Sequence, residues 1–269
     1  MNNLEKTMVD ALRDLRENYG VIGVKAEFEA EGTRMEEALR LKEVVTRAGL
    51  ELTIKVGGCE ALRDMYDARS IGVARVVSPM AESAYAVKKF IAASKLAFPE
   101  DEWKTIELAI NIETLNAFAQ LDDILASPAA KSLYAIVIGR VDMCGSMGLT
   151  RDDINTEPVL EKAFAILTKA KACGLRVGVG GGVSADSFDF FRAMPGLDYY
   201  ETRKVMFRTP AELGAKAREG ILKAVGFELM WLRNKHNYYL AIEREDSGRL
   251  AMLEKRYSKM IEEVGGHYR

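Results

Sequence analysis

Residues 105–114 read Thr-Ile-Glu-Leu-Ala-Ile-Asn-Ile-Glu-Thr, and this stretch decides the fold class. Glu107, Asn111 and Glu113 alternate with Leu and Ile, which is the period of two of a β-strand with one polar face. A strand of an open parallel sheet, covered by helices on both faces, would read as a nearly continuous apolar run. In a closed barrel the apolar face packs under the outer helices, and polar residues can face the lumen. The stretch therefore favours a barrel.

The same mixture of apolar and charged positions recurs in strands on both sides of this stretch. Polar side chains inside the predicted strands are Lys25, Glu27, Glu29, Lys55, Glu107, Asn111, Glu113, Glu201 and Arg203. Seven strands are predicted, over residues 21–29, 50–56, 73–78, 105–113, 133–138, 175–179 and 197–207. Predicted helices cover residues 4–18, 34–47, 60–70, 82–96, 115–125, 157–173 and 186–193.

Alternation of this kind predicts a parallel sheet with right-handed crossovers. We therefore expect an α/β fold, a (β/α)8-type TIM barrel with an extended C-terminal helical segment. An eighth strand is missing from the count. Either the N-terminal segment replaces it, or it is hidden in the long run 197–207.

The pattern changes after residue 208, so we expect a barrel with its N-terminal helix over residues 1–208 and a helical extension over 209–269. Thr209 and Pro210 are typical of a helix start. Two helices are expected, over 211–233 and 237–264. Their apolar residues predict oligomerisation, and the alternative is a helical pair folded back on its own barrel.

Composition excludes several classes of protein. The 269 residues carry 38 basic and 40 acidic side chains, a formal charge of −2, so no basic excess supports binding to nucleic acid. Three separated cysteines, Cys59, Cys144 and Cys173, indicate neither a disulfide framework nor a zinc site. No secretory signal or membrane-spanning stretch is visible. We expect a cytoplasmic protein without nucleic-acid or membrane partners.

Two carboxylates follow neighbouring strands. Glu113 ends the strand 105–113, and Asp142 comes just after the strand that ends at Ile138 and Gly139. Active sites of parallel barrels lie at this end of the strands, and adjacent strands are about 4.8 Å apart. Two carboxylates with positions left for water and substrate are typical of Mg²⁺ and also suit Mn²⁺. The alternative is a capping Asp142 and a solvated Glu113.

Three segments resemble the HpcH/HpaI aldolase and citrate lyase β-subunit family. Ile112-Glu113-Thr114 is similar to its I-E-T strand end. The segment from Gly139 through Asp142 to Gly148-Leu149 is similar to its G-x-x-D-L-x-x-x-L-G motif, and residues 78–83 (Ser-Pro-Met-Ala-Glu-Ser) to its P-M-V-E-(S/T) element. The resemblance covers roughly residues 21–207.

The resemblance implies a carbon–carbon lyase or aldolase assembled as trimers or hexamers. It implies a divalent metal, Mg²⁺ or Mn²⁺, on Glu113 and Asp142, and a small 2-oxo acid such as pyruvate that chelates this metal. Peptide N–H groups of Gly139, Arg140, Val141 and Asp142 would hold the substrate carboxylate. The metal would then stabilise an enolate.

The sequence departs from the family at two places. Where the family has an Arg at the second strand end, this chain has Lys55, a point charge rather than a bidentate guanidinium. Arg140, at a position where the family usually has Pro, could compensate. The family's barrel His is also missing, because the only histidines are His236 and His267 in the tail. Glu29 is then our candidate for the general base, and its alternative is an ion-pair partner of Lys25 or Lys55.

Two other features leave alternatives open. Gly180-Gly181-Gly182 could bind an anion through its N–H groups, or it could be a tight turn. Lys204 could form a Schiff base in a metal-free lysine aldolase, or it could pair with Glu201 or Glu27. A third reading is a barrel without catalysis that serves as a binding or assembly subunit.

Overall fold

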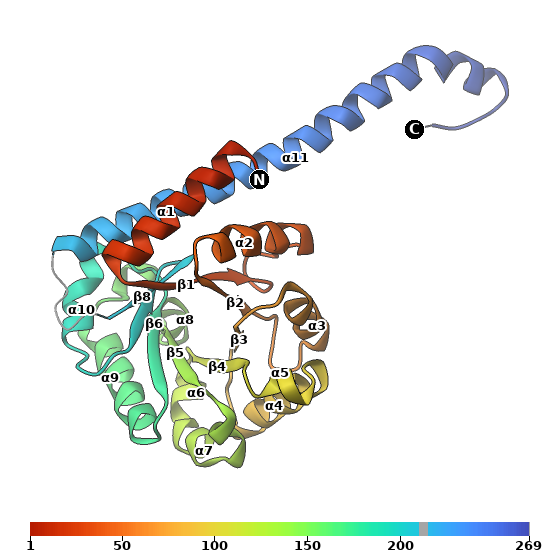
Figure 1. Ribbon diagram of the computed structural model, residues 1–269. Helices are drawn as coiled ribbons and strands as arrows, with labels where there is room; N and C mark the ends of the chain where they lie inside the picture. The colour runs from red at the N-terminus through yellow and green to blue at the C-terminus, as the bar shows by residue number, and fades with distance from the viewer. Residues whose placement is uncertain (210–214, 269) are drawn as a thin grey trace. The chain divides into compact units, whose positions relative to one another are not determined.

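The computed structural model describes residues 1–209 and 215–268 and contains a closed barrel of eight strands in chain order (Figure 1). The strands are β1 (Val21–Glu27), β2 (Glu51–Lys55), β3 (Arg75–Ser78), β4 (Glu107–Ile112), β5 (Ala135–Gly139), β6 (Arg176–Gly180), β7 (Tyr199–Glu201) and β8 (Val205–Arg208). Strands β1 to β7 are parallel to their neighbours in this series. The predicted barrel is confirmed.

The last strand corrects the prediction of an all-parallel sheet. The run 197–207 contains two strands, β7 and β8, joined by residues 202–204. Strand β8 pairs antiparallel with both β7 and β1. The eighth strand was therefore hidden in this run, and it closes the barrel by a hairpin rather than by a helical crossover. Two hydrogen bonds stabilise this turn. The Thr202 N–H donates to the Val205 carbonyl at 2.9 Å, and the Val205 N–H donates to the Thr202 hydroxyl at 3.0 Å.

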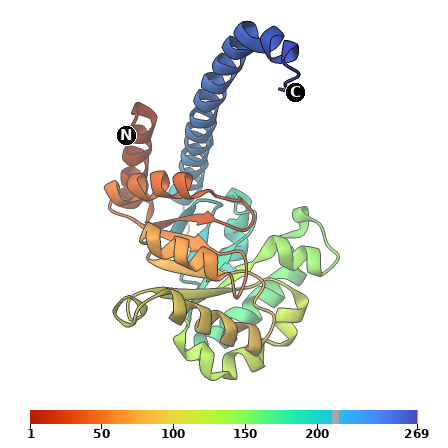
Figure 2. The same cartoon turned by 90° about the vertical axis from the view of Figure 1, so that its right-hand side faces the viewer.

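Helices surround the barrel on its outside (Figures 1 and 2). The helices of the described residues are α1 (Asn3–Tyr19), α2 (Met35–Arg47), α3 (Leu62–Ile71), α4 (Ala84–Ala97), α5 (Glu100–Trp103), α6 (Leu115–Ala119), α7 (Leu121–Ala126), α8 (Arg140–Ser146), α9 (Glu157–Ala172), α10 (Phe188–Arg192) and α11 (Ala215–Glu263), with 3-10 turns η1 (Pro128–Ser132), η2 (Arg151–Asp153) and η3 (Ala185–Ser187). Only the part of α11 up to Glu228 belongs to the same compact unit as the barrel. The predicted helix 115–125 is divided into α6 and α7 at Gln120. Helix α8 was not predicted.

The apolar faces of the strands lie under these helices as expected. Val24, Leu52, Val76, Ile110 and Ile136 are all fully buried. Helix α1 packs against the first part of α11, where the Tyr19 hydroxyl donates to Glu219 at 2.5 Å and Lys223 pairs with Asp14 at 2.7 Å. Helix α1 and the first part of α11 thus pack together on the outside of the sheet.

An apolar layer crosses the lumen about midway along the strands. It is formed by Val77, Ala109, Ala135, Val137, Tyr199 and Met206. Charged and polar side chains lie in the lumen on both sides of this layer, at the carboxyl and at the amino ends of the parallel strands. The lumen is therefore divided into two separate polar compartments.

The C-terminal segment is one continuous helix, α11, over the residues that the structure describes there, and not two. The start predicted at Pro210 and Ala211 lies outside the described residues. Neither Pro nor Gly occurs between 227 and 247, so nothing interrupts the helix where a break was expected. The chain forms two compact units, Met1–Glu228 and Leu229–Arg269, whose division lies within α11 and not at residue 208. No helix among the described residues is long and apolar enough to span a membrane.

Candidate functional site

A cavity of about 500 Å³ opens at the carboxyl ends of the parallel strands. The register places Ile112 beside Ile138 and Gly139 beside Gly180, so β4, β5 and β6 end at one level. Residues from six strands and the loops after them line the cavity, among them Lys25, Glu27, Lys55, Asn111, Glu113, Gly139, Val141, Asp142, Arg151, Gly181 and Glu201. Glu113 and Asp142, predicted to share one site, both line it.

Glu113 is held in place by neutral donors. One carboxylate oxygen accepts the Met80 N–H at 2.9 Å, and the other accepts the Asn111 side-chain amide at 2.9 Å. The residue is only 2% exposed. Burial raises the pKa of Glu113, although these two donors and the charge of Lys55 oppose the shift. No cation forms an ion pair with it among the described residues.

Glycine at position 139 makes this placement possible. A Cβ there would lie 2.3 Å from a carboxylate oxygen of Glu113, which no real contact allows. The Glu113 carboxylate, directly after β4, therefore occupies the space that a side chain at the end of β5 would need. This explains why a glycine ends the strand that precedes Asp142.

Met80 has the only positive φ among the non-glycine residues that the structure describes, at 48°. Such a conformation costs about 1–2 kcal/mol for a residue with a Cβ, and strain of this kind gathers at functional sites. Here it aims the Met80 N–H at Glu113. Sequence reasoning did not single out this residue, although it lies in the Ser78–Ser83 turn of the resemblance.

Asp142 lies in the first turn of α8 and is exposed. The segment after β5, for which no helix was predicted, is thus a short helix, and its first N–H groups have no partner within the helix. Gly181, with φ at +79°, faces them, since a Cβ there would lie 2.8 Å from the Arg140 nitrogen and 2.7 Å from that of Val141. The glycine leaves open the space in front of these amides.

The arrangement fits a divalent cation bound by few protein ligands. Among the described residues, no group of three or more His, Cys, Asp or Glu side chains could hold a metal. Three carboxylates that line this cavity, those of Glu113, Asp142 and Glu228, nevertheless form no ion pair with a cation among the described residues. The buried carbonyl oxygen of the Asn111 side chain, beside Glu113, has no hydrogen-bond partner there either. Mg²⁺ commonly takes one or two carboxylates and completes its shell with water and substrate oxygens.

Lys55 belongs to a chain of alternating charges along the opposite wall. Its ammonium nitrogen lies 2.7 Å from Glu29 and 3.8 Å from Glu27. Lys25 continues the chain, at 3.1 Å from Glu27 and 2.6 Å from Glu201. Sequence reasoning placed these residues in the lumen but did not assign Lys25, Glu27 or Glu201 to the site.

The chain of charges fixes the protonation of its members. Burial lowers the pKa of Lys25 and of Lys55, but the neighbouring carboxylates outweigh it, and both pKa values are raised. Burial raises the pKa of Glu27, yet the two lysines outweigh it and the pKa is lowered. These lysines are therefore ammonium ions at neutral pH and Glu27 is a carboxylate.

The structure places the Arg140 side chain away from the cavity, which corrects the expectation that it faces the substrate. The residue is fully buried, and its guanidinium donates to the Gly180 and Gly181 carbonyls, at 3.2 and 3.0 Å, and to Asn155 at 2.6 Å. It lies over the rings of Phe190 and Phe191. Burial lowers the pKa of Arg140 to about 10. Only its backbone remains at the site.

Glu29 and Lys204 also lie beside the cavity and not among its lining residues. Glu29 reaches it through Lys55. Lys204 is 3% exposed and bonded to Glu31 rather than to Glu201 or Glu27. Burial lowers the pKa of Lys204 despite the nearby carboxylates.

Arg151 is a lining residue that sequence reasoning missed. It is exposed at the cavity, and a Cβ on Gly182 would lie 4.0 Å from its Nε. No carboxylate forms an ion pair with it within the described ranges. Arg151 lies nine residues after Asp142 and outside the motif that ends at Leu149, so the sequence gave no sign that it lies at the cavity.

Comparisons with known proteins identify the family and the fold of the chain. The family model for HpcH/HpaI aldolase/citrate lyase matches residues 29–180. No curated protein sequence matches the chain.

Three solved structures show the same fold. The HpcH/HpaI aldolase from Desulfitobacterium hafniense DCB-2 is 15% identical with a TM-score of 0.57, over 72% of this chain and 82% of that one. A family protein from Burkholderia cenocepacia J2315 is 14% identical with a TM-score of 0.59, over 88% and 90%. Citrate synthase SbnG is 15% identical with a TM-score of 0.61, over 86% and 90%.

Proposed function

The chain belongs to the HpcH/HpaI aldolase/citrate lyase family, a family of carbon–carbon lyases, and from this premise we propose a divalent-metal-dependent reaction on a small 2-oxo acid. Glu113 and Asp142 would hold Mg²⁺ or Mn²⁺. The observation that carries this proposal is that Glu113 and Asp142, which follow the neighbouring strands β4 and β5 and have no cationic partner among the described residues, line one cavity at the carboxyl ends of the strands.

Backbone amides supply a site for the substrate carboxylate beside these ligands. The N–H groups of Arg140 and Val141, and that of Asp142 after them, begin α8, where the helix dipole favours negative charge. Gly181 leaves the Arg140 and Val141 amides accessible. When bound, the metal acts as a Lewis acid on the substrate's carbonyl oxygen.

Lys55 is the cation that balances charge in this cavity. Its raised pKa keeps it an ammonium ion, so it can attract and orient a substrate oxygen but cannot act as a base. We assign Glu29, at 2.7 Å, to position Lys55 rather than to remove a proton itself, since Glu29 does not line the cavity. Arg140 is likewise a positioning residue, because it fixes the carbonyls of Gly180 and Gly181.

Arg151 indicates that the substrate carries a second acidic group. The amides of α8 accommodate one carboxylate, and a cation without a carboxylate partner in the described ranges stands at the same cavity. A guanidinium binds a carboxylate through two parallel hydrogen bonds. We therefore favour a dicarboxylic oxo acid, either cleaved or formed by condensation.

Titration calorimetry with Mn²⁺ tests the metal site. The wild-type chain should bind one ion, and Glu113→Gln and Asp142→Asn should each abolish binding. Asp123→Asn removes an exposed carboxylate on α7 and serves as the control. Release of pyruvate or oxaloacetate from a panel of hydroxy-oxo acids, with and without EDTA, tests the reaction. Activity that survives EDTA would overturn the proposal.

The second candidate is a metal-free lysine aldolase, and the lowered pKa of Lys204 is the observation that favours it. A nucleophilic amine must be neutral, and burial makes it so more readily. Against it, Lys204 is bonded to Glu31 and does not line the cavity. Borohydride reduction with substrate present would attach substrate to Lys204 only if a Schiff base forms.

We further propose that α11 assembles the protein as a homo-oligomer, a trimer or a hexamer. Exposed apolar residues recur at spacings of three and four toward its end, at Leu250, Leu253, Tyr257 and Met260. This is the pattern of a coiled-coil seam.

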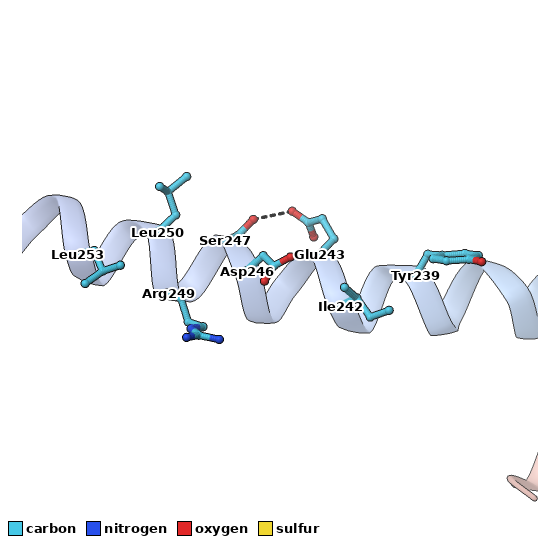
Figure 3. A pocket seen from close by; sticks show the side chains of 8 residues that line it. All are labelled: Tyr239, Ile242, Glu243, Asp246, Ser247, Arg249, Leu250 and Leu253. Atoms are coloured by element: carbon cyan, nitrogen blue, oxygen red, sulfur yellow. Dashed lines mark hydrogen bonds between the residues drawn. The ribbon is translucent and has the colours of Figure 1, made fainter. Parts of the chain in front are cut away.

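Figure 3 shows a groove along α11 that is lined by residues of this helix alone. Leu250 and Leu253 line it together with Tyr239 and Ile242, and Ser247 donates to Glu243 between them at 2.7 Å. A second copy of the helix would cover this groove. Sedimentation of the full chain and of Leu253→Glu tests assembly: the variant should dissociate, and an unchanged mass would contradict a seam at this face.

A further inference from the structure

A second cavity, of about 380 Å³, lies at the opposite end of the barrel. It is lined by residues at the beginnings of the parallel strands and by Arg208, at the end of the antiparallel β8. Its volume is within the range of small-molecule sites. The family's chemistry, at the carboxyl ends of the strands, makes no use of this end.

The apolar layer separates this cavity from the catalytic one. Val137 of this layer lines the catalytic cavity, whereas Tyr199 and Met206 line the second. Among the described residues, the two cavities share no lining residue. The second cavity is therefore a separate compartment and not the far mouth of the catalytic site.

Two guanidinium groups lie against one tyrosine ring in this cavity. The Arg75 guanidinium carbon is 4.8 Å from the centroid of the Tyr134 ring, and that of Arg176 is 5.4 Å from it. Arg75 is also 5.6 Å from the Tyr199 ring and is fixed by Glu107 at 2.9 Å. The arginine planes are thus held in position before any ligand binds, which lowers the entropic cost of binding.

The charges of the cavity leave a surplus of cations. Each acidic lining residue has a cationic partner: Glu107 pairs with Arg75, Asp198 with Lys171 at 2.9 Å, and Glu51 with Lys42 at 3.5 Å. Arg176 and Arg208 line the same cavity, and neither forms an ion pair with a carboxylate in the part of the chain that the structure describes.

A hydroxyl group adds to this imbalance. Tyr199 is 2% exposed, and its hydroxyl has no hydrogen-bond partner among the described residues. A buried hydroxyl without a partner is costly. The Tyr199 hydroxyl is therefore one further hydrogen-bond donor without an acceptor among the described residues of this cavity, which is also lined by arginines.

We propose that this cavity is a second ligand site, which binds a small organic anion through its carboxylate or phosphate group. Arg176 and Arg208 pair with the oxyanion, and Tyr134 and Met206 contact the carbon body of the ligand. Arginine suits both oxyanions because its fork of N–H groups matches their geometry. The apolar layer keeps this ligand apart from the substrate.

Calorimetric titration of the full-length protein with succinate and, separately, with inorganic phosphate tests the proposal and distinguishes the two oxyanions. At least one of these two anions should bind to the Arg151→Gln variant with the same affinity as to the wild type, because Arg151 lies at the other cavity. The double variant Arg176→Gln/Arg208→Gln should weaken binding by about tenfold or more. Arg63→Gln, an exposed arginine on α3, is the matched control. Binding that Arg151→Gln abolishes and the double variant leaves unchanged, or no binding of either anion at millimolar concentration, would overturn the proposal.

A measurement on the wild-type chain keeps the test decisive if the double variant does not fold. Phenylglyoxal modifies accessible arginines, and Arg176 and Arg208 are both exposed. The anion that binds should slow their modification, measured by peptide mass, and leave that of Arg63 unchanged. Equal modification rates with and without the anion would contradict the site.

Discussion

The two ends of the barrel lumen differ in the charge that remains once every ion pair is formed. At the carboxyl end, Glu113 and Asp142 have no cationic partner in the described chain, the lysines beside them are paired, and Arg151 has no acidic partner there. At the amino end the acids are paired, and Arg176 and Arg208 are not. Within the described residues, one barrel therefore offers unpaired carboxylates together with the Arg151 guanidinium at one end, and unpaired guanidinium groups without an unpaired carboxylate at the other.

The number of charged side chains in a lumen therefore says little about which ligand binds there. Both ends are rich in Lys, Arg, Glu and Asp, and a paired charge is already neutralised within the protein. What decides the ligand is the sign of the unpaired groups and the space before them. At the carboxyl end, Gly139 and Gly181 create this space.

The largest effect is expected from removal of a metal ligand. Glu113→Gln should lower kcat/KM by at least about a hundredfold, since a Lewis acid contributes several kcal/mol to the transition state. Anion binding at the amino end should not change, as measured by titration with succinate or phosphate. If both functions were lost together while the protein stayed folded, the two ends would not be independent.

A methyl group at position 181 should block the amides of α8. In Gly181→Ala the Cβ would fall 2.7 Å from the Val141 nitrogen, so we expect KM to rise by about ten- to a hundredfold through lost hydrogen bonds to the substrate carboxylate. Gly174→Ala is the control, because its φ of +78° imposes the same strain and nothing lies near its Cβ. Equal KM values in the two variants would contradict the amide site.

Stability should depend on Glu27 in a pH-dependent way. Its pKa is lowered below the ordinary 4.5 in the folded state, so its stabilising contribution is present above pH 4.5 and is lost as pH falls through the folded value. At pH 7, Glu27→Gln should cost about 1–3 kcal/mol of unfolding free energy, and the difference from wild type should narrow in acid. Urea denaturation between pH 3 and 7 measures it. A gap that stays constant with pH would show that the charge of Glu27 contributes nothing.

The smallest effect is expected at Arg75. Arg75→Gln removes its ion pair with the half-buried Glu107 and its contact with two rings, so we expect a loss of about 1–2 kcal/mol in unfolding free energy. Mn²⁺ binding at the other end should be unchanged. The double variant Arg75→Gln/Glu107→Gln should recover part of the loss, because it leaves no unpaired carboxylate.

The sequence predicts most of the barrel because polar and apolar positions alternate within single strands. The same alternation brings Glu113 and Asp142 to one end of neighbouring strands. It does not separate β7 from β8, because no Gly or Pro marks the turn at 202–204 within the run 197–207, and strand direction leaves no local trace.

The rest of the site depends on contacts between distant segments. Arg140 follows a strand end, where a role toward substrate was a fair expectation, but its partners Asn155, Gly180 and Gly181 come from later loops that bury it. The arginines of the amino end are equally scattered, at positions 75, 176 and 208, and each begins or ends a strand without any shared motif. Only the closed barrel brings them together.

A crystal structure grown with Mn²⁺ tests the central claim most directly. The account predicts one anomalous-density peak in the cavity at the carboxyl ends, with an oxygen of Glu113 and an oxygen of Asp142 each within about 2.0–2.3 Å of it. A cavity without such a peak, or a peak that only one of these carboxylates contacts, would contradict it.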